Sequence, residues 1–544
     1  MPVLERSLQS DLRPGSNLKG SAAGAAWTFL LPRLDLDHVV SWGAPSIPAL
    51  GTLSRLGRRV TVVLPANAAG AEDDIRRHGP TNVLLATDGT APPPASADLV
   101  YVTDPHADGD LRGPLDALSS DGHLYLEVSS YKRAREVSER LEASGHPRPL
   151  AFRLTPRDGE ARSAVPGDDR QLIDYFRRHR LGISPSLVSA RSWRDLAGLG
   201  RSTQRTGILT SGPAEPAMPP AYLSRLARSA GLNLAGYRCG LSARGRYSSR
   251  KVILYLFAPG SDRPALIVKT TRAPEFNARL QNEAQALADI HRRGLVPDGA
   301  APRALFSGTE GGLLMVAESM VEGTSLERAI ARDGWEWVDA GFEWITRLAE
   351  RSAERDAPRR EELAAAMEQI IEMADALYAL NADEHRQLGD AAARIGDSAL
   401  SVPVVYFHGD ATVKNAVVTP SGGVAFLDWE AADPLGVALW DLFYFARSAA
   451  LSGKGMRRRL AAQPVRLVRT LAEDQRMARA VGVYCLRAGV SEEAVPALFQ
   501  MCWLHRAVKE AARLPASGLE GGHYINLLRA VLRFRGEAPW FARP

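Results

Sequence analysis

The sequence predicts a mixed fold, α/β plus α+β: a parallel sheet domain followed by a β-rich region and a helical region. Three observations predict it. Residues 38–128 alternate short β-rich runs with helical or turn stretches, and residues 233–322 combine β-rich runs with one helix. From about residue 323 the pattern is almost wholly helical. The 544 residues exceed one ordinary core, because domains commonly hold about 150 residues.

The composition is that of a globular protein and argues against several classes of partner. Hydrophobic residues make up 45% of the chain and charged residues 24%, so sizeable cores can form. No stretch offers about 18 uninterrupted apolar residues, and the N-terminus has no apolar signal segment, so we expect no membrane partner. The net charge is +5, but the basic residues are scattered, which argues against nucleic acid.

Cysteine and lysine are both rare. Cys239, Cys485 and Cys502 lie far apart without CxxC or Cys/His spacing, so neither a disulfide framework nor a zinc site is indicated. A reducing, cytoplasmic location is therefore expected. There are 7 lysines against 60 arginines. Because a compact ammonium and a planar guanidinium are not interchangeable, Lys269 and Lys414 draw attention in the motifs below.

The first domain is expected over residues 1–185. Its runs HVVSWG, RVTVVLP, NVLLAT, DLVYVT and HLYLEV recur about every 15 to 25 residues, which predicts a parallel sheet with crossover helices. AFRLTPRDGEARSAVP, from Ala151, predicts a terminal hairpin with a turn at RDGE. Residues 186–232 are rich in Ser, Gly, Pro and Ala and are expected to form a linker.

The element order of residues 1–185, with DLVYV before SSDGHLYLEV, resembles a class I S-adenosylmethionine-dependent methyltransferase domain. Such a Rossmann-like domain normally carries a glycine-rich turn after its first strand and an acid after its second. Here the turn reads GAPSIPALG, in which Pro45 and Pro48 lack backbone N–H groups, and no acid lies from Pro65 to Gly70. The sequence favours a degenerate module that does not bind S-adenosylmethionine, with a working methyltransferase as the alternative.

Two short motifs in the helical region carry polar groups suited to phosphate chemistry. HGDATVKN begins at His408, and LDWEAADP begins at Leu427; each follows a short apolar run. Two short strands would hold Asp410, Asn415 and Asp428 near one another. Asp410 could accept a hydrogen bond from an incoming hydroxyl and take its proton. The oxygens of Asn415 and Asp428 are hard ligands that suit Mg²⁺ bridging ATP phosphates, although each residue taken alone is more often a turn former or helix cap.

Together these motifs resemble the aminoglycoside phosphotransferase and choline kinase family, which shares the protein-kinase-like fold. The resemblance covers residues 233–544 and implies a β-rich lobe over 233–322 and a helical lobe over 323–544. It implies that Asp410 is the catalytic base and that Asp441 braces the catalytic loop. Asn415 and Asp428 would hold the metal. The family pattern, HGD-x4-N, a DWE motif and a later DL pair, is met by His408, Gly409, Asp410, Asn415, Asp428, Trp429, Glu430, Asp441 and Leu442.

An upstream lysine and glutamate fit the same resemblance. In ALIVKTTR, Lys269 follows three apolar strand residues. In the next helix, Glu283 lies on the apolar stripe of Leu280 and Leu287, so it is expected to point inward. A buried carboxylate costs several kcal/mol unless it is paired, and Lys269 is the predicted partner. The kinase-like fold uses such a pair to hold a lysine on the α and β phosphates of ATP.

The resemblance also suggests the remaining nucleotide contacts. In CGLSARGRYSSRKVIL, Gly245 and Ser248 would cover the phosphates. The stretch departs from the GxGxxG pattern of protein kinases, and Ser249 stands where the family often has Asn. After LLMVAES, backbone groups near Glu318 and Met320 would face adenine.

The expected function is transfer of the ATP γ-phosphoryl group to a hydroxyl of a small molecule. Only twelve residues separate Asp428 from Asp441, too few for the peptide-binding segment of a protein kinase. Residues 451–544 hold 16 Lys and Arg against 7 Asp and Glu, which favours a neutral or anionic sugar, nucleoside-like metabolite or alcohol over a polycation, although a solvated helical face would carry the same charges. The alternatives are a nucleotide-binding pseudokinase or scaffold and a bifunctional kinase-methyltransferase.

Overall fold

The chain folds into two compact units. Among the described residues, the sheet unit lies within 26–277 and 305–320, and the helical unit lies within 278–304 and 321–534. The computed structural model describes residues 26–65, 68–86, 92–102, 111–155, 163–179, 181, 205–211, 216–243, 251–452 and 463–534.

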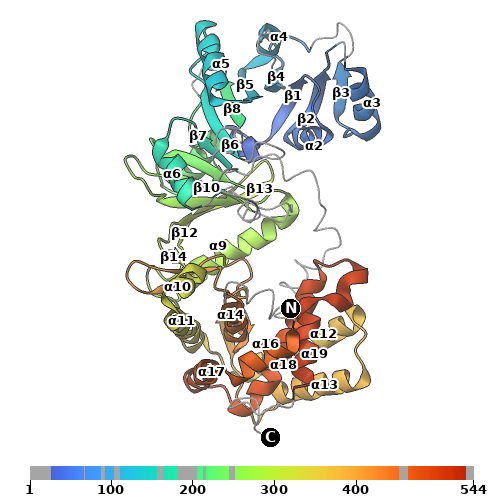
Figure 1. Cartoon of the computed structure of the whole chain (residues 1–544), viewed down its shortest axis with the longest axis vertical. Coiled ribbons are helices and arrows are strands. Elements are labelled where there is room, and N and C mark those ends of the chain that lie inside the picture. The colour runs from blue at the N-terminus through green and yellow to red at the C-terminus, as the bar shows by residue number, and fades with distance from the viewer. Residues whose placement is uncertain are drawn as a thin grey trace, which may run out of the picture. The chain divides into compact units, whose positions relative to one another are not determined.

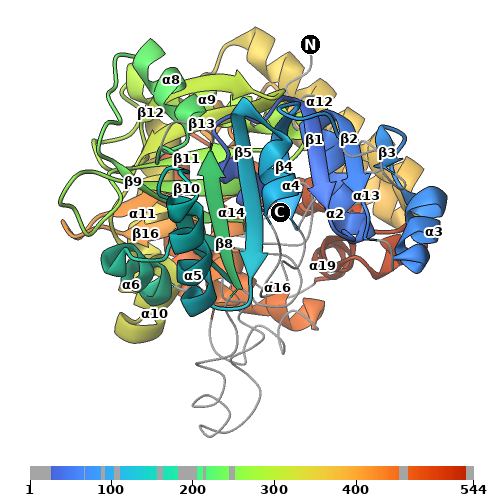
Figure 2. The ribbon, with the colours of Figure 1, turned by 90° about the horizontal axis from the view of Figure 1, so that it is seen from above.

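One sheet runs through the sheet unit (Figures 1 and 2). Its strand order is β12-β13-β11-β10-β9-β7-β6-β8-β5-β4-β1-β2-β3. The strands are β1 (Leu36–Trp42), β2 (Gly57–Val63), β3 (Val83–Ala86), β4 (Ala97–Val102), β5 (Leu118–Val128), β6 (Leu150–Thr155), β7 (Ser163–Pro166), β8 (Arg205–Ser211), β9 (Arg238–Ser242), β10 (Val252–Phe257), β11 (Leu266–Thr270), β12 (Ala304–Glu310) and β13 (Leu313–Ser319).

The N-terminal half of this sheet is parallel, as the sequence predicts. β1 pairs with β2 and β4, β2 with β3, and β4 with β5, all in parallel. Neighbouring residues of β1 serve opposite faces: Val39 belongs to one apolar core and Val40 to another. Helices therefore cover both faces, with α2 (Ile47–Leu56) and α8 (Ala221–Ser229) contributing to the first core and α5 (Tyr131–Ala143) to the second.

The turn after β1 is a capped helix start rather than a glycine-rich loop. The side-chain Oγ of Ser46 accepts a hydrogen bond from the N–H of Ala49 (3.3 Å), and Pro48 lies in the first turn of α2. The other helices of this unit are η2 (Ala26–Leu30), α3 (Ala69–His78), α4 (Arg112–Asp116), α6 (Arg170–Arg178) and η4 (Pro274–Phe276).

The C-terminal half of the sheet is antiparallel and joins the first half without a break. β6 and β7 form the predicted hairpin, whose RDGE turn lies outside the described residues. The linker expected at 186–232 is corrected in part, because residues 205–211 form β8, which pairs with both β5 and β6. β7 then pairs with β9, the first strand of the predicted β-rich lobe. The wider division into domains at 1–185, 186–232, 233–322 and 323–544 stays a prediction.

The helical unit is built on one large apolar core. Its most deeply buried side chains include Trp429, Trp440 and Trp503. None of the helices in the described ranges is long and apolar enough to cross a membrane. The helices are α9 (Asn277–Arg292), α10 (Leu326–Asp333), α11 (Glu336–Ser352), α12 (Ala357–Leu377), α13 (Ala382–Gly396), α14 (Trp440–Ala450), α16 (Pro464–Glu473), α17 (Gln475–Ala488), α18 (Val495–Ala511) and α19 (His523–Leu532), with 3-10 turns η5 (Glu492–Ala494) and η6 (Ala516–Gly521) (Figure 1).

Candidate active site

Short strands bring the two motifs of the helical unit together. β16 (Ala416–Val418) pairs antiparallel with β17 (Val424–Phe426), and β14 (Thr324–Ser325) adds a third strand. β15 (Val404–Phe407) pairs with β18 (Asp433–Val437) and leads into HGDATVKN. Just beyond the β16–β17 ladder, the N–H of Leu427 donates to the carbonyl oxygen of Asn415 (2.7 Å). The residue after Leu427 is Asp428, so the ladder places both motifs side by side.

Asp410 and Asn415 are in direct contact. The amide Nδ2 of Asn415 donates to Oδ2 of Asp410 (2.8 Å) and to its backbone oxygen (3.0 Å). Asp428 has a positive φ of 68°, a backbone conformation that is uncommon outside glycine. The structure therefore brings together the three residues predicted as base and metal ligands, while Lys414 in the same loop is exposed.

Asp441 holds the start of the catalytic loop from α14. Its two carboxylate oxygens accept separate backbone hydrogen bonds, Oδ2 from the N–H of His408 and Oδ1 from the N–H of Gly409 (3.1 Å). Asp441 is buried, and this desolvation raises the pKa of its carboxyl group, while the positive charge of Arg506 and the two hydrogen bonds oppose the rise. This contact is the one expected of a bracing residue.

Gly409 occupies a position that no other residue fits. Its φ is +77°, and a Cβ atom added there would lie 1.9 Å from the carbonyl oxygen of Ala431. Only glycine combines the left-handed conformation with this close approach of two backbone segments.

His408 is fully buried, and both of its ring nitrogens are engaged. Nδ1 accepts a hydrogen bond from the N–H of Asp410 (3.2 Å), so the proton must sit on Nε2, which donates to the carbonyl oxygen of Leu427 (3.0 Å). Burial lowers the pKa of this imidazole, which keeps the ring neutral. His408 thus ties the two motifs together as a structural residue.

Arg506 of α18 is a neighbour of the catalytic loop that the motifs did not reveal. Its Nη2 donates to the carbonyl oxygen of Gly409 (2.9 Å), and its guanidinium lies 3.5 Å from the centroid of the Tyr444 ring. Burial raises the pKa of Asp410, and the charge of Arg506 opposes that rise. In the sequence, the one signal for Arg506 is an arginine within the mostly apolar run CWLHRAV.

Helix α9 supports the second motif. Glu283 is fully buried, as predicted, and its Oε1 accepts a hydrogen bond from the N–H of Trp429 (3.1 Å). The amide of Asn282 donates to the carbonyl oxygens of Glu430 (3.1 Å) and Ala432 (2.9 Å). These contacts fix the loop that follows Asp428.

In the sheet unit, Lys269 has a partner that the sequence did not indicate. Its Nζ lies 2.9 Å from Oε2 of Glu318. Ile267 of β11 is paired with Glu318 of β13, and Lys269 is two residues from Ile267, so both charged side chains share one face as diagonal neighbours. The predicted contact between Lys269 and Glu283 would join the two units and stays a prediction.

The expected adenine contacts near Glu318 and Met320 stay a prediction, and the structure shows what two groups there contact. Glu318 contributes a buried carboxylate to Lys269, and the N–H of Met320 donates to the carbonyl oxygen of Ala265 (3.2 Å), so this donor is used within the sheet unit. Gly245 and Ser248, expected over the phosphates, lie outside the described residues.

The donor chemistry of the catalytic loop fits magnesium. Asp428 supplies carboxylate oxygens. The nitrogen of the Asn415 amide donates to Asp410, which leaves the amide oxygen as a metal donor. In the described part of the chain, no three His, Cys, Asp or Glu side chains gather as a metal cluster. A metal here would therefore depend on the Asn415 oxygen and on ligands other than protein, as is usual where magnesium is bound together with phosphates.

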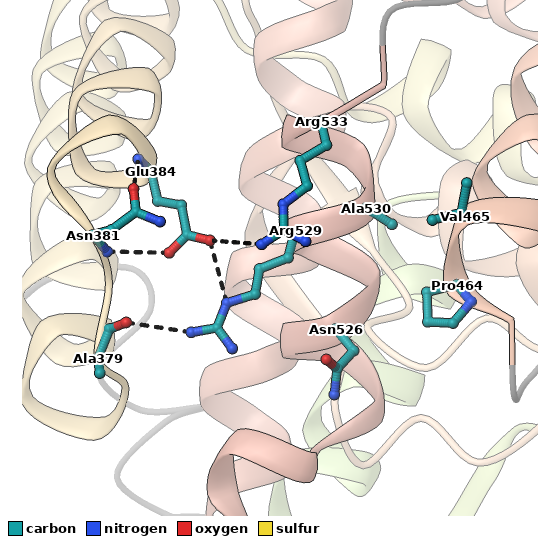
Figure 3. A pocket seen from close by; sticks show the side chains of 9 residues that line it. All are labelled: Ala379, Asn381, Glu384, Pro464, Val465, Asn526, Arg529, Ala530 and Arg533. Carbon is teal, nitrogen blue, oxygen red and sulfur yellow. Dashed lines mark hydrogen bonds and ion pairs between the residues drawn. The ribbon is translucent and has the colours of Figure 1, made fainter.

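A separate cavity of about 400 Å³ lies in the helical unit, beside α13, α16 and α19 (Figure 3). Glu384 points into it and is 3.3 Å from Nε of Arg529 and 3.9 Å from Nη2 of Arg533. The backbone N–H of Asn381 also donates to Glu384 (3.1 Å). The negative charge of Glu384 is therefore compensated by two arginines and a backbone N–H. We assign no catalytic role to this cavity.

Comparison with known proteins agrees with the motifs. No curated protein matches the chain. Among solved structures, the aminoglycoside phosphotransferase APH(3'')-Id from Streptomyces rimosus in complex with ADP and streptomycin is 17% identical, covering 54% of this chain and 98% of that one, with a TM-score of 0.31. A SAM-dependent O-methyltransferase from Thermotoga maritima is 12% identical over 34% of this chain and 62% of that one (TM-score 0.22). WbdD, crystallised with the kinase inhibitor LY294002, is 12% identical over 87% and 88% of the two chains (TM-score 0.25). Residues 245–477, which contain both motifs, match the phosphotransferase enzyme family, so the predicted resemblance is confirmed.

Proposed function

We propose that the chain transfers the γ-phosphoryl group of ATP to a hydroxyl of a small molecule, with magnesium as the cofactor. The family match supports a phosphotransferase. One observation supports the proposed use of ATP, magnesium and a hydroxyl acceptor. It is the 2.8 Å hydrogen bond between Asn415 and Asp410, which joins the proposed metal ligand to the proposed base within one loop.

In the proposed reaction, Asp410 orients the acceptor hydroxyl and takes its proton. The hydroxyl oxygen forms the new bond to the γ-phosphorus, the bond between that phosphorus and the β,γ-bridging oxygen breaks, and ADP leaves. Asn415 and Asp428 would hold magnesium, which supplies positive charge to the phosphate oxygens. Lys269 would hold the α and β phosphates, with Glu318 fixing its ammonium group.

The test compares wild type with Asp410→Asn. Full-length protein is incubated with ATP, magnesium and a pool of hydroxyl metabolites, and phosphorylated products are detected by mass spectrometry. Loss of the base should lower turnover by about 100-fold or more, while binding of magnesium-ADP persists. Asp390→Asn on the exposed face of α13 is the matched control and should keep wild-type turnover.

Two outcomes would contradict the proposal, the first its mechanism and the second the enzyme assignment. Undiminished turnover in Asp410→Asn would remove the base from the mechanism. Binding of magnesium-ADP by wild type without transfer to any acceptor would favour the alternative of a nucleotide-binding scaffold.

A further inference from the structure

Two arginines of the helical unit, Arg506 and Arg447, form no ion pair with a carboxylate in the described ranges. Arg506 is bonded to a carbonyl oxygen and an aromatic face. Arg447 of α14 lies 4.7 Å from the centroid of the Tyr524 ring, and its Nη2 and Nε lie 2.6 and 3.2 Å from Nε2 of His523. No acidic side chain lies within ion-pair distance of either guanidinium in that part of the chain.

Arg447 lies on α14, the helix from which two residues contact the catalytic loop. On α14, Asp441 holds the loop at His408 and Gly409, and Ser448 accepts the N–H of Val413 through its Oγ (3.1 Å). The spacing of 441, 444 and 448 puts these residues on one helix face, which therefore lies against the loop. Arg447 adjoins Ser448 and is one turn beyond Tyr444.

Among the described residues, the side chains in contact with Arg447 are aromatic rings and a neutral imidazole. His523 receives its hydrogen bonds through a ring nitrogen, so that nitrogen is unprotonated. The carboxylate of Glu510 accepts the N–H of Tyr524 (2.8 Å). Tyr444 and Tyr524 are bonded to each other through their hydroxyls (3.1 Å). A half-buried cation in such a setting is stabilised further when an anion completes its hydrogen bonds.

The two arginines differ in what they can reach. Arg506 is 7% exposed and committed to Gly409 and Tyr444, so it belongs to the frame of the loop. Arg447 is half-buried, and its planar guanidinium is held in place by His523 and Tyr524. A guanidinium held in one orientation at a partly exposed position presents parallel N–H donors, which is the usual way that arginine binds a carboxylate or phosphate.

We propose that Arg447 binds an anionic group, phosphate or carboxylate, on the acceptor whose hydroxyl Asp410 orients. This inference rests on the proposed function and narrows its acceptor class to an acidic or phosphorylated sugar or alcohol. Arg447 is then a specificity-determining residue, and His523 and Tyr524 are its positioning residues.

The experiment measures anion binding by calorimetry on the full chain. Inorganic phosphate and malonate are titrated separately, with and without a saturating, non-hydrolysable magnesium-ATP analogue that fills the γ-phosphate position. Both anions should bind wild type, and Arg447→Gln should weaken the binding by about tenfold. Arg447→Lys keeps the positive charge but loses the parallel N–H donors of the guanidinium, so its anion affinity should lie between those of wild type and Arg447→Gln. This variant also serves as a control for misfolding of the glutamine variant. Arg469→Gln, an exposed position on α16, should match wild type.

The outcomes separate this proposal from the function it rests on. Tighter binding of phosphate or of malonate identifies the acceptor group as phosphate or carboxylate. Absence of anion binding to wild type, equal binding by Arg447→Gln, or loss of anion binding once the ATP analogue is bound would each overturn the proposal. Failure of the ATP analogue to bind would reject the proposed kinase function instead, while the comparison of wild type with Arg447→Gln would still decide the anion site.

Discussion

At Gly409 the catalytic loop allows no side chain. Gly409 has a φ of +77°, and a methyl group added to it would collide with the backbone of Ala431. Its N–H is bonded to Asp441 and its carbonyl oxygen to Arg506, so the loop is held from two helices at one residue. Substitution here should therefore disturb both the geometry and the stability of the site.

We expect Gly409→Ala to destabilise the protein by about 2–6 kcal/mol, since backbone strain and overpacking each contribute about 1–3 kcal/mol. Denaturant unfolding measures the loss. Gly422→Ala is the matched control, because Gly422 has a φ of +81° with nothing near its missing Cβ, and it should lose only about 1–2 kcal/mol. Equal losses for the two variants would show that the contact with Ala431 is unimportant.

Asp441 should make stability depend on pH. Because burial raises its pKa above the ordinary 3.8, the folded protein holds this proton to a higher pH than the unfolded chain. The contribution of this protonated carboxyl group to folding stability is complete below its pKa in the unfolded chain. It is lost as the pH rises through its pKa in the folded protein. The difference in unfolding free energy, wild type minus Asp441→Asn, should thus decrease as pH rises above about 4. A difference that stays constant from pH 3 to 8 would contradict the shift.

At the scale of elements, α9 is the support of the loop after Asp428. Glu283 and Asn282 together satisfy three backbone groups of that loop, those of Trp429, Glu430 and Ala432. Neighbouring positions on one helix therefore fix a segment that is distant in sequence.

Asn282→Ala should cost about 1–3 kcal/mol, because two loop carbonyls lose their donor. Gln285→Ala on the exposed face of the same helix should change stability by no more than about 0.5 kcal/mol. Thermal unfolding of the two variants measures the contrast, and turnover should fall in Asn282→Ala alone. Similar unfolding temperatures would mean that the loop holds its shape without α9.

The elements that sequence could predict are those with a local pattern. β1 to β5 follow their apolar runs, and the stripe of α9 correctly predicted that Glu283 is buried. β8 was missed because RTGILTS lies in a stretch rich in Ser and Gly, and its place between β5 and β6 depends on distant pairing. The pairing of Lys269 with Glu318 depends on strand register, which a single sequence does not specify.

The candidate site divides in the same way. The contiguous motifs led to Asp410, Asn415, Asp428 and Asp441, and the structure gathers these residues around one loop. Arg506 comes from α18, which carries no motif, and Tyr444 lies on α14 outside the DL pair, so only the folded chain brings these two side chains to the loop. Side chains that act through tertiary contacts carry no local signal.

At the scale of the whole molecule, the sheet unit merges the parallel sheet with the predicted β-rich lobe. The junction pairs Ser163 with Ser242 and Ala164 with Leu241. α6 adds an apolar contact across it, since Tyr175 and Phe176 pack with Phe257. The two parts of the sheet therefore support each other.

A fragment of residues 233–544 should be less stable than the full chain. It exposes β9 as an edge and loses Val165, Tyr175 and Phe176, whose burial is worth about 1.5–3 kcal/mol each. Residues 150–544, which keep β6 to β8 and α6, should recover part of the loss. Calorimetric unfolding of the three proteins tests this, and an unchanged unfolding temperature for 233–544 would show that the junction contributes nothing.

The fixed tautomer of His408 gives the catalytic loop a spectroscopic signature. One ring nitrogen carries the proton and the other accepts from the chain, so the imidazole should show two well-separated ¹⁵N chemical shifts. Solvent-exposed histidines exchange between tautomers and average these shifts. Nuclear magnetic resonance of the ring would therefore report, without any ligand or turnover, whether the loop has assembled.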